Sequence, residues 1–125
     1  MIIRKVCKFC PVFIFFSKYT KKWFNRVGVT FLPFPIVLIE ETAKEDIGLI
    51  AHESIHGKQA YTYPFISGFL YLFSKKFRYK MEVEGYKEQL KYCPDRLVCL
   101  SRFAKSLSTK YNEDVTEAKA LSDLV

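Results

Sequence analysis

The chain has 125 residues, of which 50% are hydrophobic and 26% are charged. This excludes an intrinsically disordered protein and fits one domain with its own core. The net charge of +7 belongs to residues 1–39, which hold seven basic residues and no acidic one. No apolar run reaches the ~20 residues of a membrane-spanning helix, and no small-residue cleavage site follows the basic N-terminus. We therefore expect a single cytoplasmic domain over residues 1–125.

Residues 1–28 form a predicted basic aromatic arm. Its basic residues are interleaved with aromatic ones: Phe9, Phe13, Phe15, Phe16, Tyr19, Trp23 and Phe24. Such a segment is attracted to anionic lipid or another polyanion. The alternative is a solvated basic face over a buried aromatic face. We expect at most weak association with an anionic membrane surface and no specific nucleic-acid partner.

The four cysteines do not form a recognisable zinc ribbon. Cys7 and Cys10 have the spacing of a ribbon or a redox pair, but Cys93 and Cys99 lie six residues apart. A ribbon needs a second close pair. The sequence therefore favours reduced, mainly structural thiols.

The first predicted elements are a strand and a helix. Ile36 to Ile39 is a strand candidate, and the preceding prolines restrict it to an edge or to first strand positions. Thr42 and Glu45 have the spacing of a capping box. Apolar residues then recur with helical periodicity up to about Ala60, at Ile47, Ile50, Ala51 and Ile55.

Four more helices are expected. Pro64 begins the second, about 65–77, which is apolar nearly all round and therefore predicted to be the central packing element. The third covers about 79–92 and ends before Pro94. The fourth and fifth cover about 96–108 and 116–124. The expected fold class is α+β, a mainly helical single domain with one or two short N-terminal strands.

The chain's two histidines stand in one motif, His52-Glu53-Ser54-Ile55-His56. Residues i and i+4 share a helix face, so both imidazoles can reach one metal ion, with Glu53 placed to act on water there. A catalytic zinc site usually has three protein ligands. The third must be a carboxylate or a thiolate, and the best source is the third helix, which carries Glu82 and Glu84.

This motif and the glutamate helix resemble those of gluzincin-type zinc metallopeptidases, particularly small ImmA/IrrE-like peptidases with a zincin-like fold. The resemblance covers residues 42–90. In that family the glutamate helix reads Glu-x-x-Ala followed by Asn or Asp. Glu82 begins the matching segment 26 residues after His56, and Gly85 keeps the small residue. The resemblance implies His52, His56 and Glu82 as Zn²⁺ ligands, with Glu84 as second choice. Tyr86 departs from the family pattern.

The implied function is zinc-dependent hydrolysis of peptide bonds in a peptide or protein substrate. Glu53 would be the general base, and Tyr61, Tyr63 and Tyr86 are candidate oxyanion donors. Gly57 either permits a close approach of backbone or substrate, or reflects packing. The alternative function is a non-catalytic, zinc-containing binding module. It would act through the basic aromatic arm at a membrane or partner surface.

Overall fold

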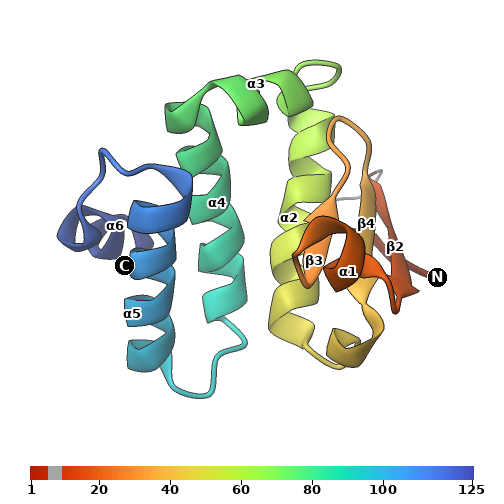
Figure 1. Cartoon of the computed structure of the whole chain (residues 1–125), viewed down its shortest axis with the longest axis horizontal. Helices are drawn as coiled ribbons and strands as arrows, with labels where there is room; N and C mark the ends of the chain where they lie inside the picture. The colour runs from red at the N-terminus through yellow and green to blue at the C-terminus, as the bar shows by residue number, and fades with distance from the viewer. Residues whose placement is uncertain (6–9) are drawn as a thin grey trace.

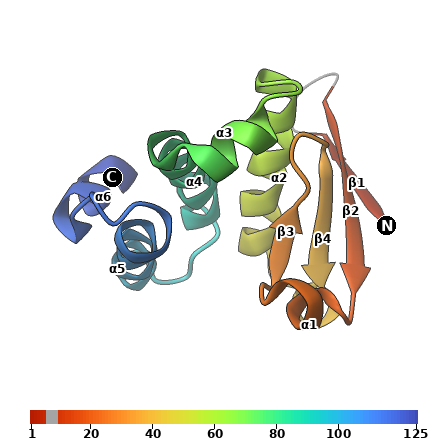
Figure 2. The ribbon, with the colours of Figure 1, turned by 45° about the horizontal axis from the view of Figure 1, so that its top comes forward.

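The computed structural model describes residues 1–5 and 10–125. A small sheet forms one side of the molecule, α2 packs on it, and α4 and α5 follow on the other side (Figures 1 and 2). The strands are β1 (Ile2–Lys5), β2 (Pro11–Ser17), β3 (Gly28–Thr30) and β4 (Ile36–Glu40). The helices are α1 (Thr20–Phe24), α2 (Ile47–Thr62), α3 (Ser67–Phe73), α4 (Lys75–Leu90), α5 (Arg96–Ser106) and α6 (Glu117–Leu124). The α+β, mainly helical single domain is therefore confirmed.

The described residues form one four-stranded mixed sheet rather than one or two short strands. Its order is β1-β2-β4-β3, with β2 and β4 parallel and the two outer strands antiparallel to their neighbours. Alternate residues of β2 and β4 are fully buried, at Val12, Ile14, Val37 and Ile39. Much of the expected basic aromatic arm is thus β1, β2 and α1, built into the domain. The strand predicted at Ile36 is confirmed, and it lies inside the sheet.

The helix with the histidine motif begins later than the capping box indicated. Asp46 is its N-cap, and the Asp46 carboxylate accepts a hydrogen bond of 2.9 Å from the Leu49 N–H. Thr42 instead lies in η1, a 3₁₀ turn over Glu41–Ala43. Asp46 stands directly before the first helical residue, and its short side chain reaches the backbone N–H groups that have no partner within the helix.

Gly57 sets the approach of α2 to the sheet. A Cβ atom at this position would lie 2.7 Å from both γ-carbons of Val12 on β2. No larger side chain fits without moving the helix or the strand. The packing interpretation of Gly57 therefore holds, because the position that a side chain would occupy faces the sheet.

The second predicted helix is wrong in its extent and its role. The chain forms two helices there, since Ser74 is extended and its hydroxyl accepts a hydrogen bond from the Phe77 N–H as the N-cap of α4. The preceding helix, α3, bridges the tops of α2 and α4 (Figure 1). It does not form a central core, because most of its apolar side chains are exposed. Across residues 1–5 and 10–125, no helix has the length and hydrophobicity to cross a membrane.

The C-terminal half has its own core between α4, α5 and α6. The buried members include Leu90, Leu100, Phe103, Leu107 and Leu124. A short π-helix, η2 (Leu107–Tyr111), follows α5, and Tyr111 at its end is buried.

The expectation of reduced thiols is wrong for the C-terminal pair. Cys93 in the α4–α5 connection and Cys99 in the first turn of α5 form a disulfide. Their Cα atoms lie 6.5 Å apart, because the short connection turns α5 back alongside α4. Cys7 of the other predicted pair lies outside the described residues.

Candidate metal centre

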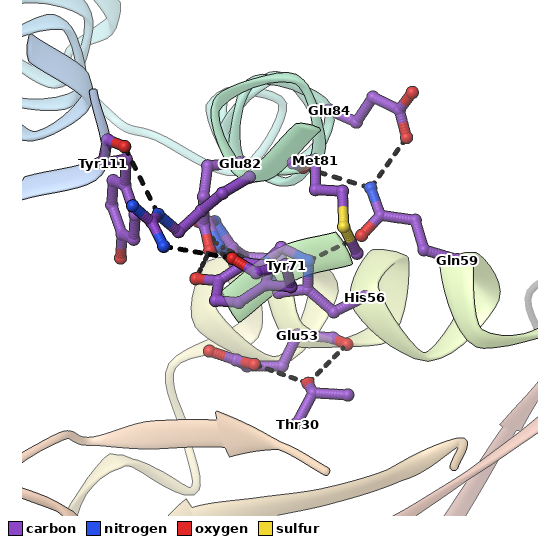
Figure 3. A network of polar contacts seen from close by, with 11 residues as sticks. Thr30, Glu53, His56, Gln59, Tyr71, Met81, Glu82, Glu84 and Tyr111 are labelled. Atoms are coloured by element: carbon purple, nitrogen blue, oxygen red, sulfur yellow. Dashed lines mark hydrogen bonds and ion pairs between the residues drawn. The ribbon is translucent and has the colours of Figure 1, made fainter. Parts of the chain in front are cut away.

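Three side chains converge between α2 and α4. His52 Nε2 lies 3.0 Å from one Glu82 carboxylate oxygen, and His56 Nε2 lies 3.1 Å from the other. The two Nε2 atoms are themselves 3.1 Å apart. All three residues are buried, and the Glu82 side chain projects from α4 toward α2, which carries the histidines (Figure 3).

The spacing of these atoms fits a tetrahedral metal site. Two atoms bound to one zinc ion at 2.0–2.1 Å lie about 3.3 Å apart. The three closest pairs here are 3.0 to 3.1 Å apart, and the group could hold one ion. Two imidazole nitrogens and a carboxylate are a donor set that suits zinc. A small outward adjustment would therefore be enough to admit the ion.

Gln59 fixes the tautomer of His56. The amide N–H₂ of Gln59 faces two acceptors, the Met81 carbonyl at 3.1 Å and the Glu84 carboxylate at 2.7 Å. The amide oxygen must then be the atom 2.7 Å from His56 Nδ1, and it accepts the Nδ1–H hydrogen bond. With Nδ1 carrying a proton, Nε2 is the nitrogen that donates to Glu82 when the ring is charged and that offers its lone pair to a metal when the ring is neutral.

Close packing holds the His52 ring in addition to the contact of its Nε2 atom with Glu82. A Cβ atom on Gly85 would lie 2.9 Å from His52 Nε2, so the small residue admits the imidazole against α4. The Tyr86 ring meets the His52 ring edge on, with centroids 4.5 Å apart. Within the described residues, His52 Nδ1 is buried and has no hydrogen-bond partner. Tyr86 thus does not orient His52 through its hydroxyl.

Tyr71 of α3 completes the environment of the glutamate. Its hydroxyl donates a 2.6 Å hydrogen bond to a Glu82 oxygen. Burial, the charge of Glu82 and this hydrogen bond together raise the pKa of Tyr71 far above its usual value. Tyr71 therefore remains a protonated donor, and it holds the orientation of the carboxylate (Figure 3).

The histidines and the glutamate are electrostatically coupled. Burial alone would lower the pKa of His56, but the charge and hydrogen bond of Glu82 outweigh it and raise that pKa to about 9. Burial alone would raise the pKa of Glu82, but the charge of His56 and hydrogen bonds from both histidines lower it well below its usual range. Without a metal, the group is a buried ion pair centred on a carboxylate.

The Glu53 side chain also belongs to α2, but it projects toward the sheet. The Thr30 hydroxyl on β3 donates a 2.7 Å hydrogen bond to the Glu53 carboxylate (Figure 3). A Cβ atom on Gly28, also on β3, would lie 2.9 Å from the other carboxylate oxygen. Glycine here makes room for the glutamate, and the threonine sets its direction. The carboxylate is thereby kept beside the histidines and within the same cavity.

A cavity of about 490 Å³ gives access to these groups. Its wall includes both histidines, Glu53, Glu82 and the side chains of Arg26, Tyr71 and Tyr111. Mainly apolar residues from α1, β3, the β3–β4 loop and α3 form the rest of the wall. The cavity can therefore receive a molecule with an apolar portion and bring it to two carboxylates, two imidazoles and a guanidinium.

The structure brings together the sequence-predicted residues His52, Glu53, His56 and Glu82. Glu84 points away from them and binds Gln59. Of the predicted oxyanion donors, Tyr61 donates to the Pro11 carbonyl and Tyr63 stacks edge on with Phe77; neither lines the cavity.

Sequence reasoning missed Thr30, Gln59 and Tyr71. Gln59 had a usable signal, since it lies three residues after His56 on the same helix face. The other two reach the site from a distant strand and a separate helix, and local spacing does not reveal such contacts.

No protein-family model matches the chain, and neither the curated proteins nor the solved structures include a significantly similar one.

Proposed function

We propose that this chain is a zinc-dependent metallopeptidase of the gluzincin type, acting on a peptide or protein substrate. The observation that carries the proposal is the convergence of His52, His56 and Glu82, whose ligand atoms lie within 4.8 Å of one another. A buried ion pair alone does not require a second imidazole nitrogen directed at the same point. A metal ion does, because it needs three convergent donors.

The residues divide the chemistry between them. Bound zinc would supply a Lewis acid and would lower the pKa of a water molecule to about 7. Glu53 would accept the proton of the attacking water and later deliver it to the leaving amine. Thr30 would keep the Glu53 carboxylate in place during both transfers. The Arg26 guanidinium lines the cavity and carries a permanent positive charge, which would stabilise the oxyanion that develops on the substrate carbonyl.

The first experiment measures zinc per chain in purified protein. We expect about one ion in the wild type and a large loss in His56→Ala and Glu82→Ala, because each removes one of three ligands. Glu84→Ala is the matched control on the same helix and should keep its zinc. Zinc content unchanged in both His56→Ala and Glu82→Ala would contradict the assigned ligands.

The second experiment separates catalysis from binding. Glu53→Gln preserves shape and removes the base, so zinc should remain while cleavage of a broad peptide library falls at least ~100-fold. A zinc-loaded wild type that cleaves nothing in the library would contradict the peptidase proposal. It would favour instead the non-catalytic binding module, which has no need of a base at this position.

A further inference from the structure

An apolar surface surrounds the mouth of the cavity. It is formed by α3, the turn before it and the β3–β4 loop, and we call it the apolar rim: Phe31, Phe34, Phe65, Phe69, Leu72 and Phe73. All six are exposed, and Phe31, Phe69 and Leu72 also line the cavity. The described N- and C-terminal segments do not lie over it (Figures 1 and 2).

The rim is one continuous surface made from two distant parts of the chain. A Cβ atom on Gly68 would lie 2.7 Å from the Leu32 carbonyl oxygen, so α3 rests directly on the β3–β4 loop. On α3, the Phe69 and Phe73 rings lie 4.8 Å apart, centroid to centroid. These contacts fix the rim as part of the folded domain. Scattered exposed apolar residues are ordinary, but a contiguous group beside a cavity marks an interaction site.

Phe65 gives a second, independent indication. Its side chain is 90% exposed, and its backbone has a φ of 69°. The left-handed region is unfavourable for a bulky residue, and here no burial of the ring offsets the strain. The turn between α2 and α3 thus holds a large aromatic side chain out into the solvent.

The charges around the rim select its partner. The rim residues belong to two segments, 1–39 and 54–81, and neither contains a single acidic residue. Together these segments hold 12 basic residues, including Lys75 and Lys76 directly after α3. All 13 acidic residues lie in 40–53 and 82–125. In the fold, Lys75 is paired with Glu113 and lies 3.8 Å from Asp114, whereas Lys76 beside it is exposed. An aromatic and aliphatic surface flanked by exposed basic residues such as Lys76 is complementary to anionic lipid headgroups above an apolar interior.

We propose that the apolar rim docks on an anionic lipid surface, with its aromatic side chains at the headgroup boundary and the cavity mouth facing the membrane. This surface differs from the N-terminal arm that the sequence suggested. It also does not depend on the metal, so His52→Ala should bind lipid as the wild type does.

The test is co-sedimentation of the full chain with vesicles of phosphatidylcholine, with or without about 30 mol% phosphatidylglycerol. We expect binding to the anionic vesicles that weakens with salt. Phe69→Ser/Phe73→Ser should reduce it at least ~10-fold through lost apolar contact. Lys76→Glu should reduce it by about 5-fold or more. Both rim phenylalanines are exposed, so the double variant should remain folded, which circular dichroism can verify.

Leu97→Ser is the matched control. Leu97 is 78% exposed in the first turn of α5, and α5 lies beside α4 away from α3, which crosses the top of the molecule in Figure 1; its loss should leave vesicle binding unchanged. Three results would overturn the proposal. One is no binding at low salt, and another is loss in Trp23→Ala with retention in the rim variant, which would assign binding to the arm. The third is a wild-type dimer that the rim variant converts to a monomer without any lipid binding, which would make a second copy the occupant.

Discussion

Gly85→Ala should separate metal affinity from fold stability. The new methyl group would lie 2.9, 3.0 and 3.1 Å from the Nε2, Cε1 and Cδ2 atoms of His52. Unstrained contacts between such atoms are about 3.5–4.0 Å, so the imidazole must retreat by about 0.5 Å or more. The rings of Tyr86 and His56, with centroids 4.5 and 4.9 Å from that of His52, restrict where it can go.

The shift matters more to a metal site than to the fold. Zinc–nitrogen bonds of 2.0–2.1 Å tolerate departures of about 0.2 Å, so a displacement of ~0.5 Å should weaken zinc binding by about 10-fold or more. For the metal-free protein, alanine gains ~1 kcal/mol of helix propensity within α4. Overpacking costs about 1–3 kcal/mol. The net loss of unfolding free energy should therefore lie between about 0 and 2 kcal/mol.

Zinc affinity would be measured by competition with a colorimetric chelator, and stability by urea unfolding in the presence of EDTA. Gly48→Ala in the first turn of α2 is the control. Gly48 lies one turn before His52, but its added methyl group would meet the flexible Gln89 side chain at 3.2 Å and no histidine atom is among its three nearest contacts, so zinc affinity should be unchanged. A folded Gly85→Ala protein with wild-type zinc affinity would refute the described role of His52.

Three further predictions concern the supporting residues. Gln59→Leu removes the acceptor that fixes the second histidine's tautomer, so chelator competition should show zinc affinity reduced by about 10–100-fold; an unchanged affinity would contradict this role. Thr30→Val removes the hydrogen bond to Glu53, so peptide cleavage should fall by about 10–100-fold at constant zinc content. Zinc loss in that variant would instead indicate damage to the ligands. Replacing Cys93 and Cys99 by serine should lower the unfolding free energy by about 2 kcal/mol in urea and leave zinc bound, whereas unchanged stability would show that this disulfide adds nothing to the fold.

The local pattern predicted the helices that carry the proposed metal ligands. Four-residue spacing and apolar periodicity placed both histidines on one helix face, and the structure has them there. The distance from His56 to Glu82 along the chain corresponds to a turn, a short helix and the start of the next helix. The family resemblance selected Glu82 over Glu84, and their burial separates them in the same way, since Glu82 is 2% exposed and Glu84 is exposed.

The local sequence pattern did not predict the four-stranded sheet or the exposed position of α3. Basic residues around the first strands indicated a basic aromatic arm, either a surface for a polyanion or a solvated basic face over buried aromatic residues. In the structure Val12 and Ile14 alternate with less buried residues, as a strand requires. In 65–73, the nearly uniform apolar character gave no preferred face. Whether such a helix is buried depends on the surfaces available to it. Here α2 and α4 already cover each other, and α3 lies across their ends.

Adjacent residues of α2 contact different parts of the fold, which bears on the order in which the site forms during folding. His52 and Glu82 are 30 residues apart, and they meet through the packing of two helices that follow closely in the chain. Glu53 reaches its position only when β3 is added from the N-terminal part. The two pairings span similar lengths of chain, 30 residues for His52–Glu82 and 23 for Thr30–Glu53, so the helical pair has no advantage of short sequence separation. The proposed zinc would instead add its binding free energy to the packing of α4 on α2, which would stabilise that pair before the sheet is complete. Stopped-flow refolding with and without zinc measures this directly: acceleration by the metal is expected, and an identical rate would show that the ligands meet only after the main barrier.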